Sequence, residues 1–250
     1  MDEVLGALQA LLAPPRHMLL ILAAGWLGLH LADRRAGQYG LASQELDNIA
    51  GAGMLAFILG GRMGYVLIHA AVFIQAPAGI VSLNPGLFSP LLGGAAALAA
   101  SAAYVWQRRL ALTRVLDALT PLLAILAIGA GLSNLASGAA FGKPSDVPWS
   151  ITLWGAQRHP SQSYETLAAT LTMLAAWRTS AAERSGTAFA IFAAWTAGWN
   201  IFLRAFRAEG TWLPNGTRLD QVAAWLALFV ALVMLDLLSE EPAEIKTARH

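Results

Sequence analysis

Seven apolar stretches, separated by short polar connectors, make up most of the pattern of hydrophobic and polar positions along the chain. Most are close to the roughly 20 residues that a helix needs to cross a bilayer, although the fifth is short and rich in threonine. The connectors hold charged, glycine or proline residues, which are typical of helix ends. The pattern predicts an all-α, polytopic integral membrane protein with seven transmembrane helices, at residues 18–32, 49–74, 87–106, 116–141, 164–177, 187–203 and 222–238.

We expect the seven stretches to form a single domain over residues 1–250, with two further segments attached to it. Residues 1–17 carry Asp2 and Glu3 where a signal peptide has a basic region, so we expect them to remain on the protein as a short amphipathic segment. Residues 142–162 form the longest polar connector, and we expect them to be an outer loop.

Composition supports the membrane interpretation and excludes several other classes of protein. Hydrophobic residues make up 57% of the chain and charged residues only 12%, whereas a soluble domain carries about 25% charged residues. A net charge of +1 argues against a nucleic-acid binder, so we expect no nucleic-acid partner. The chain has no cysteine, which removes thiolate catalysis and cysteine-based metal sites, and we expect neither a metal nor a cofactor.

The distribution of Lys and Arg between the connectors predicts the orientation. One side of the membrane receives nine of these residues: Arg34, Arg35, Arg108, Arg109, Arg114, Arg178, Arg184, Lys246 and Arg249. The other side receives six: Arg16, Lys143, Arg158, Arg204, Arg207 and Arg218. Because cytoplasmic loops carry the excess of basic residues, the N-terminus is expected outside and the C-terminus in the cytoplasm.

Arg62 lies near the middle of the second stretch, where an arginine costs about 2.5–3.5 kcal/mol on insertion scales. It must therefore face the protein or water and have a partner. A structural ion pair or a snorkelling side chain is one interpretation. The flanking Gly60, Gly61 and Gly64 allow a backbone or a ligand to approach the guanidinium, which favours a lipid-binding site.

Asn134 and Gly138 form a second polar interruption, in the outer half of the fourth stretch. With Ser133 and Ser137 they make one part of the helix thin and polar, as a pocket for a lipid headgroup requires. The alternative is that Asn134 only joins two helices by a hydrogen bond.

The sixth stretch ends with Asn200, Arg204 and Arg207, at positions i, i+4 and i+7, which predicts one shared helical face. Two guanidinium groups at the outer end of a span form a suitable phosphate site. The competing interpretation is interfacial snorkelling. Arg218, in the loop beyond, is expected to be solvated.

A compact polar motif, His159 to Glu165, marks the point where the chain re-enters the membrane. Ser161 is expected to be the N-cap of the next helix. His159 has an unperturbed pKa of about 6.5, which suits a general base, although a lone histidine in such a motif is more often a turn residue. The predicted topology places this motif, Asn134 and the two arginines in the outer half of the bundle, which favours a site for an outer-leaflet headgroup.

Three segments together resemble the bacterial prolipoprotein diacylglyceryl transferases in order and spacing: GGRMGYVLIH at 60–69, NLASGAAFGKPSDVPW at 134–149 and HPSQSYE at 159–165. The resemblance implies a seven-helix protein of the bacterial inner membrane, with its site on the outer side. Members of the family move a diacylglyceryl group from phosphatidylglycerol to the sulfur of the lipobox cysteine in a prolipoprotein signal peptide, releasing glycerol phosphate. The implied partners are phosphatidylglycerol, that signal peptide and the bilayer.

The chain departs from the family pattern at several positions. The family shows His-Gly-Gly near the start of the third span, where this chain reads GLFSPLLGG. In the fourth span Asn134 and Gly138 match, but Gly131 replaces an arginine, and Ser137 and Ala139 replace an asparagine and a glutamate. In the sixth span Asn200 and Arg204 stand for an arginine and a glutamate, and only Arg207 matches.

These departures leave three hypotheses. The first is a divergent transferase in which Arg204 and Arg207 bind the phosphate, with Arg62, Asn134 and Gly138 contributing to lipid binding, while His159 and Glu165 handle protons. The second is a catalytically degenerate paralogue that binds lipid or a lipoprotein signal peptide. The third is a transporter or another lipid-modifying enzyme, against which the chain shows no pair of broken helices in inverted halves.

Overall fold

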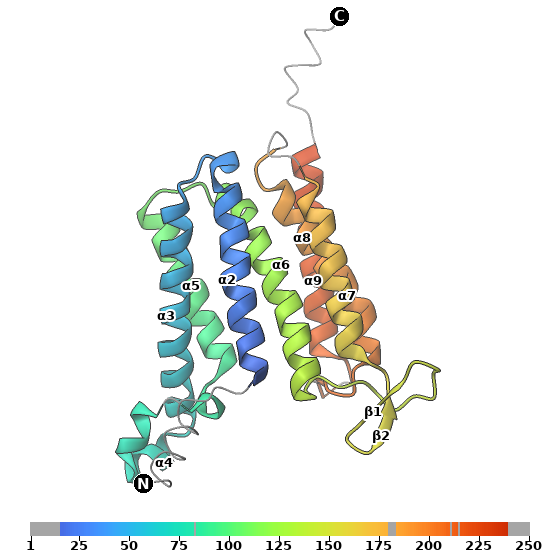
Figure 1. The fold of residues 1–250 in the computed structure, drawn as a ribbon. Helices are drawn as coiled ribbons and strands as arrows, with labels where there is room; N and C mark the ends of the chain where they lie inside the picture. Colours follow the sequence, from blue (N-terminus) through green and yellow to red (C-terminus); the bar gives the residue numbers. More distant parts are fainter. Residues whose placement is uncertain (1–15, 83, 180–183, 211, 215, 240–250) are drawn as a thin grey trace, which may run out of the picture. The chain divides into compact units, whose positions relative to one another are not determined.

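The computed structural model describes residues 16–82, 84–179, 184–210, 212–214 and 216–239, and the part described is mainly helical (Figure 1). Each predicted apolar stretch overlaps a long helix: α2 (Arg16–Ala36), α3 (Ser43–Ile68), α5 (Pro90–Gln107), α6 (Leu112–Ser137), α7 (Ser161–Trp177), α8 (Thr187–Leu203) and α9 (Leu219–Ser239). Short helical turns join them: η1 (Gly37–Tyr39), α4 (Ala70–Gln75), η2 (Pro77–Val81), η3 (Pro85–Leu87) and η4 (Arg204–Phe206). Nearly all of the predicted segment 1–17 lies outside the described residues.

Within the described residues, four helices are long and apolar enough to cross a membrane: Ser43–Ile68, Leu112–Ser137, Thr187–Phe206 and Leu219–Ser239. Large apolar side chains also remain exposed along the helices, as on α9, where Trp225, Leu226 and Phe229 are uncovered. Apolar faces of this extent are unusual in contact with water but stable in contact with lipid. A helix can enter the bilayer because its backbone polar groups are hydrogen-bonded within the helix. The expectation of a helical membrane protein is confirmed at this level.

The chain divides into two compact units, Asp33–Ala118 and Met1–Ala32 with Leu119–His250. In the first unit, α3 and α5 pack directly through glycine. A Cβ added at Gly60 would lie 2.3 Å from Ala96 Cβ, and one added at Gly64 would lie 2.5 Å from Leu92 Cδ1. Small residues at these positions allow the close helix approach that is common in membrane bundles.

Arg62, in the first unit, is only 8% exposed and fixes the loop that follows α4. Its Nε donates to the carbonyl of Ile80 at 2.8 Å, its Nη1 donates to that of Leu87 at 2.7 Å, and its Nη2 donates to that of Gly79. Within the described residues, the partners of Arg62 are therefore backbone carbonyls, and not the acidic side chain that the alternative interpretation as an ion pair requires. The charge is compensated by peptide dipoles, which hold η2 and η3 against the end of α3.

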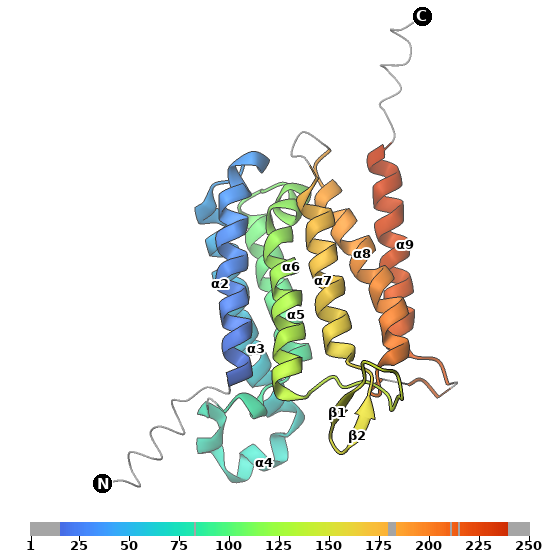
Figure 2. The same cartoon turned by 45° about the vertical axis from the view of Figure 1, so that its right-hand side comes forward.

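The second unit contains α2 up to Ala32, α6 from Leu119 onward, and the whole of α7, α8 and α9 (Figure 2). A Cβ added at Gly28 of α2 would lie 2.9 Å from the Leu122 backbone, and one at Gly131 of α6 would lie 2.3 Å from Thr166 Oγ1 of α7. Gly131 is therefore the point at which α7 packs closely against α6. Any larger residue at this position would have to displace Thr166.

The connector 142–162, which the sequence predicts to be an outer loop, contains a β-hairpin that the sequence pattern did not predict (Figure 1). Strands β1 (Ile151–Leu153) and β2 (Ala156–Arg158) pair antiparallel, with Leu153 opposite Ala156. The two turn residues have positive φ, 53° at Trp154 and 73° at Gly155. Such a two-residue turn matches the twist of the strands, but it is an unusual position for tryptophan.

Candidate functional site

A short extended segment after α6 joins the hairpin to the end of α8. The backbone N–H of Lys143 donates to Phe206 O at 2.8 Å, and that of Ala208 donates to Phe141 O at 3.1 Å. On its other side, the His159 N–H donates to Lys143 O at 3.1 Å. This segment thereby fixes the position of the start of α7 relative to the end of α8.

Gly142 makes this arrangement possible, and we predict that Gly142→Ala is strongly destabilising. An added Cβ would lie 2.2 Å from the His159 carbonyl oxygen, so the backbone would have to move. We expect a loss of about 1–3 kcal/mol in the free energy of unfolding, as for other overpacked sites. Chemical denaturation in detergent measures it. Gly198→Ala on α8, where an added Cβ meets nothing within 4 Å, is the control, and equal stability of the two variants would contradict the prediction.

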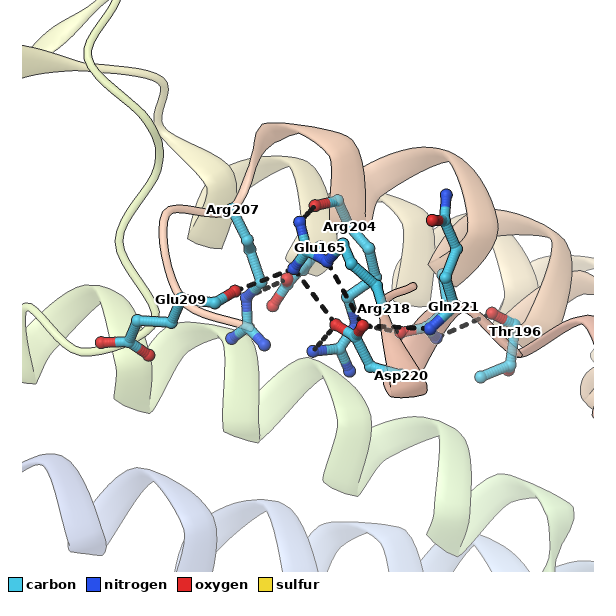
Figure 3. Close-up of polar contacts among 9 residues, drawn as sticks. Glu165, Thr196, Arg204, Arg207, Glu209, Arg218, Asp220 and Gln221 are labelled. Carbon is cyan, nitrogen blue, oxygen red and sulfur yellow. Dashed lines mark hydrogen bonds and ion pairs between the residues drawn. The ribbon is translucent and has the colours of Figure 1, made fainter. Parts of the chain in front are cut away.

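Arg207 and Glu165 form an ion pair, with Arg207 Nε 2.8 Å from Glu165 Oε1 (Figure 3). The prediction that Asn200, Arg204 and Arg207 share one helical face is wrong for Arg207. The α-helix ends at Leu203, and Arg207 has extended backbone angles (φ −75°, ψ 137°) because it pairs with Gly142. Asn200 and Arg204 do lie together, since Arg204 Nε donates to Asn200 Oδ1 at 3.2 Å.

Arg218 is the arginine that the sequence reading misjudged. It was expected to be solvated, but it is only 7% exposed. Its Nη1 donates to Arg204 O at 2.8 Å, its Nη2 donates to Glu209 O at 2.9 Å, and both Nε and Nη2 contact the Asp220 carboxylate. Asp220 also lies 3.6 Å from Arg204 Nη1, which joins α8 to the start of α9 (Figure 3).

We call Arg204, Arg207, Arg218, Glu165 and Asp220 the arginine cluster. Its three guanidinium groups face two carboxylates, so its formal charge exceeds neutrality by one positive unit. The side chains of Arg204 and Arg207 are partly covered, at 29% and 15% exposure, which strengthens their interactions relative to water. The arrangement suits one further anion with several oxygen acceptors, such as a phosphate.

His159 lies in an aromatic group beside the arginine cluster. Its ring packs edge-on against Phe206, with centroids 5.1 Å apart, and its Nδ1 is 3.4 Å from the Tyr164 hydroxyl. That hydroxyl also accepts a hydrogen bond of 2.6 Å from Trp149 Nε1. Because Tyr164 precedes Glu165 and Phe206 precedes Arg207, the aromatic group adjoins the ion pair.

Buried side-chain hydrogen bonds to the segment after α6 hold the start of α7 in place. Ser161 was expected to be the N-cap, but Pro160 occupies that position, and the Ser161 hydroxyl donates instead to Ala140 O at 2.8 Å. Gln162 Nε2 donates to Ala139 O at 2.9 Å. Both side chains are buried, so this motif positions the helix that carries Glu165.

Gly138 and Asn134 lie at the end of α6. Gly138 has φ +70°, which ends the helix, and its carbonyl accepts a hydrogen bond of 2.9 Å from Trp154 Nε1. Asn134 is half-buried one turn earlier, and its carbonyl accepts from Ser137 Oγ. Among the described residues, the Asn134 side-chain amide has no hydrogen-bond partner.

The structure therefore brings together Glu165, Arg204 and Arg207, with His159 beside them, whereas Arg62 belongs to the other compact unit. Sequence reasoning missed Arg218 and Asp220, for which the only signal was an arginine two residues before a carboxylate at a predicted helix start. The described residues contain no group of three metal-ligating side chains.

Comparisons with known proteins agree with the resemblance. A phosphatidylglycerol–prolipoprotein diacylglyceryl transferase from Pseudoalteromonas translucida is 31% identical over 153 residues, which cover 59% of this chain and 57% of that protein. The protein of the same name from Rhodospirillum rubrum is 35% identical over 150 residues, 58% of this chain and 54% of that protein. That from Methylobacillus flagellatus is 28% identical over 221 residues, 85% of this chain and 84% of the relative.

The first two alignments span little more than half the length of those relatives. The family model described as prolipoprotein diacylglyceryl transferase matches residues 16–237, which include every element of both compact units from α2 to nearly the end of α9. On the strength of that match, the chain belongs to the prolipoprotein diacylglyceryl transferase family.

Proposed function

We propose that this protein transfers a diacylglyceryl group from phosphatidylglycerol to the lipobox cysteine sulfur of a prolipoprotein, at the outer face of the bacterial inner membrane. One observation carries the proposal for this chain. The arginine cluster has one more positive charge than its carboxylates neutralise, and it lies at the end of an apolar helix. If that helix spans the membrane, its end lies at the depth of the phospholipid phosphates.

In this proposal, Arg207 and Arg204 bind the headgroup phosphate. The headgroup phosphate replaces Glu165 at Arg207 Nε, and Arg204 provides a second guanidinium from the same cluster. Charge-assisted hydrogen bonds of this kind contribute about 1.5–3 kcal/mol each. The phosphate gains negative charge as it leaves, so fixed arginines stabilise the transition state more than the bound lipid.

The reaction requires one proton acceptor. A bond forms between the cysteine sulfur and the glycerol carbon of the diacylglyceryl group, and the bond from that carbon to the phosphate oxygen breaks. The electron pair leaves with glycerol phosphate, and the thiol proton passes to a base. Glu165 becomes available when phosphate replaces it on Arg207. His159 is the second candidate, with its Nδ1–H donated to Tyr164 so that Nε2 accepts the proton.

The other predicted lipid-binding residues receive distinct roles in the proposal. The unpartnered amide of Asn134 is the available hydrogen-bonding group for a headgroup hydroxyl. Gly138 shapes the end of α6 and docks the hairpin through Trp154. Arg62 acts by fixing the loop after α4, because three carbonyls already occupy its guanidinium.

Complementation tests the proposed activity directly in cells. The protein is expressed in a bacterial strain depleted of its own transferase, and a reporter lipoprotein is analysed by mass spectrometry. We expect a diacylglyceryl thioether on the reporter. A strain that contains the folded protein but only unmodified reporter would contradict the activity and favour a degenerate lipid-binding paralogue.

The proposed orientation predicts which positions are accessible from outside. Since the chain has no cysteine, Asp146→Cys and Ser239→Cys each introduce a single thiol. We expect a membrane-impermeant maleimide to label position 146 in intact spheroplasts and position 239 only after lysis. The reverse labelling would contradict a C-terminus in the cytoplasm.

A further inference from the structure

Three exposed tryptophans gather at the hairpin end of the second unit. Trp149 is 61% exposed, Trp154 67% and Trp212 59%. The first two belong to the hairpin and its approach. The third lies in the loop after η4, where its ring stacks on the buried Arg218 guanidinium at 5.2 Å.

The polar atoms of two of these indoles are already used inside the protein. Trp149 Nε1 donates to the Tyr164 hydroxyl, and Trp154 Nε1 donates to Gly138 O. What they present outward is therefore apolar ring surface. Trp154 keeps this position although its φ of 53° is unfavourable for a bulky side chain. Because the Trp154 ring is exposed and its backbone is strained, we infer that a contact outside the protein stabilises tryptophan at this position.

The lengths of the neighbouring helices place this end of the unit relative to a bilayer. Helices α7 and α8 each have 17 residues, so each is about 25 Å long. The hydrocarbon core of a bilayer is about 30 Å thick. If the far end of either helix reaches the opposite interface, the end next to the hairpin cannot extend beyond the headgroup layer.

The charge of the same region complements an anionic lipid surface. The two connectors, residues 142–162 and 204–218, contain five basic residues, Lys143, Arg158, Arg204, Arg207 and Arg218, against two acidic residues, Asp146 and Glu209. When Glu165 and Asp220, which pair with the three arginines of the cluster, are included, one positive charge remains in excess. Tryptophan and basic residues together are typical of the boundary between headgroups and acyl chains.

From these observations we propose that the hairpin and Trp212 lie in the interfacial layer of the membrane, with the rings of Trp149 and Trp154 against the lipid. The protein then holds the arginine cluster at the depth of phospholipid headgroups. This inference depends on the membrane orientation of the second unit and is independent of whether transfer occurs.

A single fluorescent label on the hairpin tests the proposal. Thr152→Cys places one thiol on the exposed side of β1 and is labelled with an environment-sensitive fluorophore. The labelled protein is reconstituted into phosphatidylglycerol-containing vesicles. We expect blue-shifted emission and quenching by lipids that carry a nitroxide near the headgroup end of the acyl chain. Emission typical of water, without lipid quenching, would overturn the proposal.

Trp154→Asn, in the same labelled background, is the matched variant. It creates Asn-Gly, the pair that this turn type favours, so the two-residue turn is preserved, while the ring and its hydrogen bond to Gly138 O are both lost. We expect quenching to fall roughly twofold, because one of the two hairpin anchors is gone. Unchanged quenching would overturn the role of Trp154. Quenching that appears only when a lipobox peptide is added would show that the rings contact peptide rather than lipid, and would also overturn the proposal.

Discussion

Arg207→Ala is expected to weaken binding of phosphatidylglycerol by roughly tenfold or more, because a charge-assisted hydrogen bond to phosphate contributes about 1.5–3 kcal/mol. The substitution leaves Glu165 as an unpaired carboxylate in the arginine cluster, which further disfavours an anion. Lipid binding measured by native mass spectrometry gives the affinity, and thioether formation on a cysteine peptide gives the activity of the same sample.

Two variants define what the Arg207 result means. Arg178→Ala removes the same charge from an exposed position at the other end of α7, and we expect it to bind lipid normally. Glu165→Gln removes the carboxylate that competes with phosphate, so lipid binding should be kept or strengthened while thioether formation falls. Normal lipid binding by Arg207→Ala would remove the proposed headgroup site.

The second large effect is expected for Arg218→Ala, which should lower the free energy of unfolding by about 1.5–3 kcal/mol or more, because a hydrogen bond that involves a charged group contributes that much and several acceptors lose the same buried donor. Asp220 would lose its nearest cation, and the carbonyls of Arg204 and Glu209 would lose their donors. Chemical denaturation in detergent measures the change. Arg178→Ala is again the control, and equal stability of the two variants would show that the Arg218 contacts contribute little.

The helices could be predicted from the sequence because each depends on a local run of apolar residues. The predicted stretch 187–203 coincides with α8, and 164–177 differs from α7 by three residues at its start. The burial of Arg62 also followed from its position in an apolar run. Its partners did not, since Gly79, Ile80 and Leu87 come from a loop whose path no local pattern specifies.

The candidate site could be predicted only in part, because its contacts are non-local. Helical spacing placed Arg207 on the face of Arg204, but pairing with Gly142 pulls its backbone into an extended conformation. Arg218 was predicted to be solvated, and its burial could not be foreseen because the carbonyls that it binds lie on other segments. The pairing of Glu165 with Arg207 joins the start of α7 to the segment just after α8, and no rule of sequence spacing connects these two positions.

Thioether formation by the purified protein tests the central claim most directly. The protein is reconstituted with phosphatidylglycerol and a peptide that carries a lipobox cysteine, and the peptide and the released phosphate ester are analysed by mass spectrometry. The proposal predicts a peptide with one diacylglyceryl group on sulfur and an equal amount of glycerol phosphate. Unmodified peptide in the presence of bound phosphatidylglycerol would contradict it.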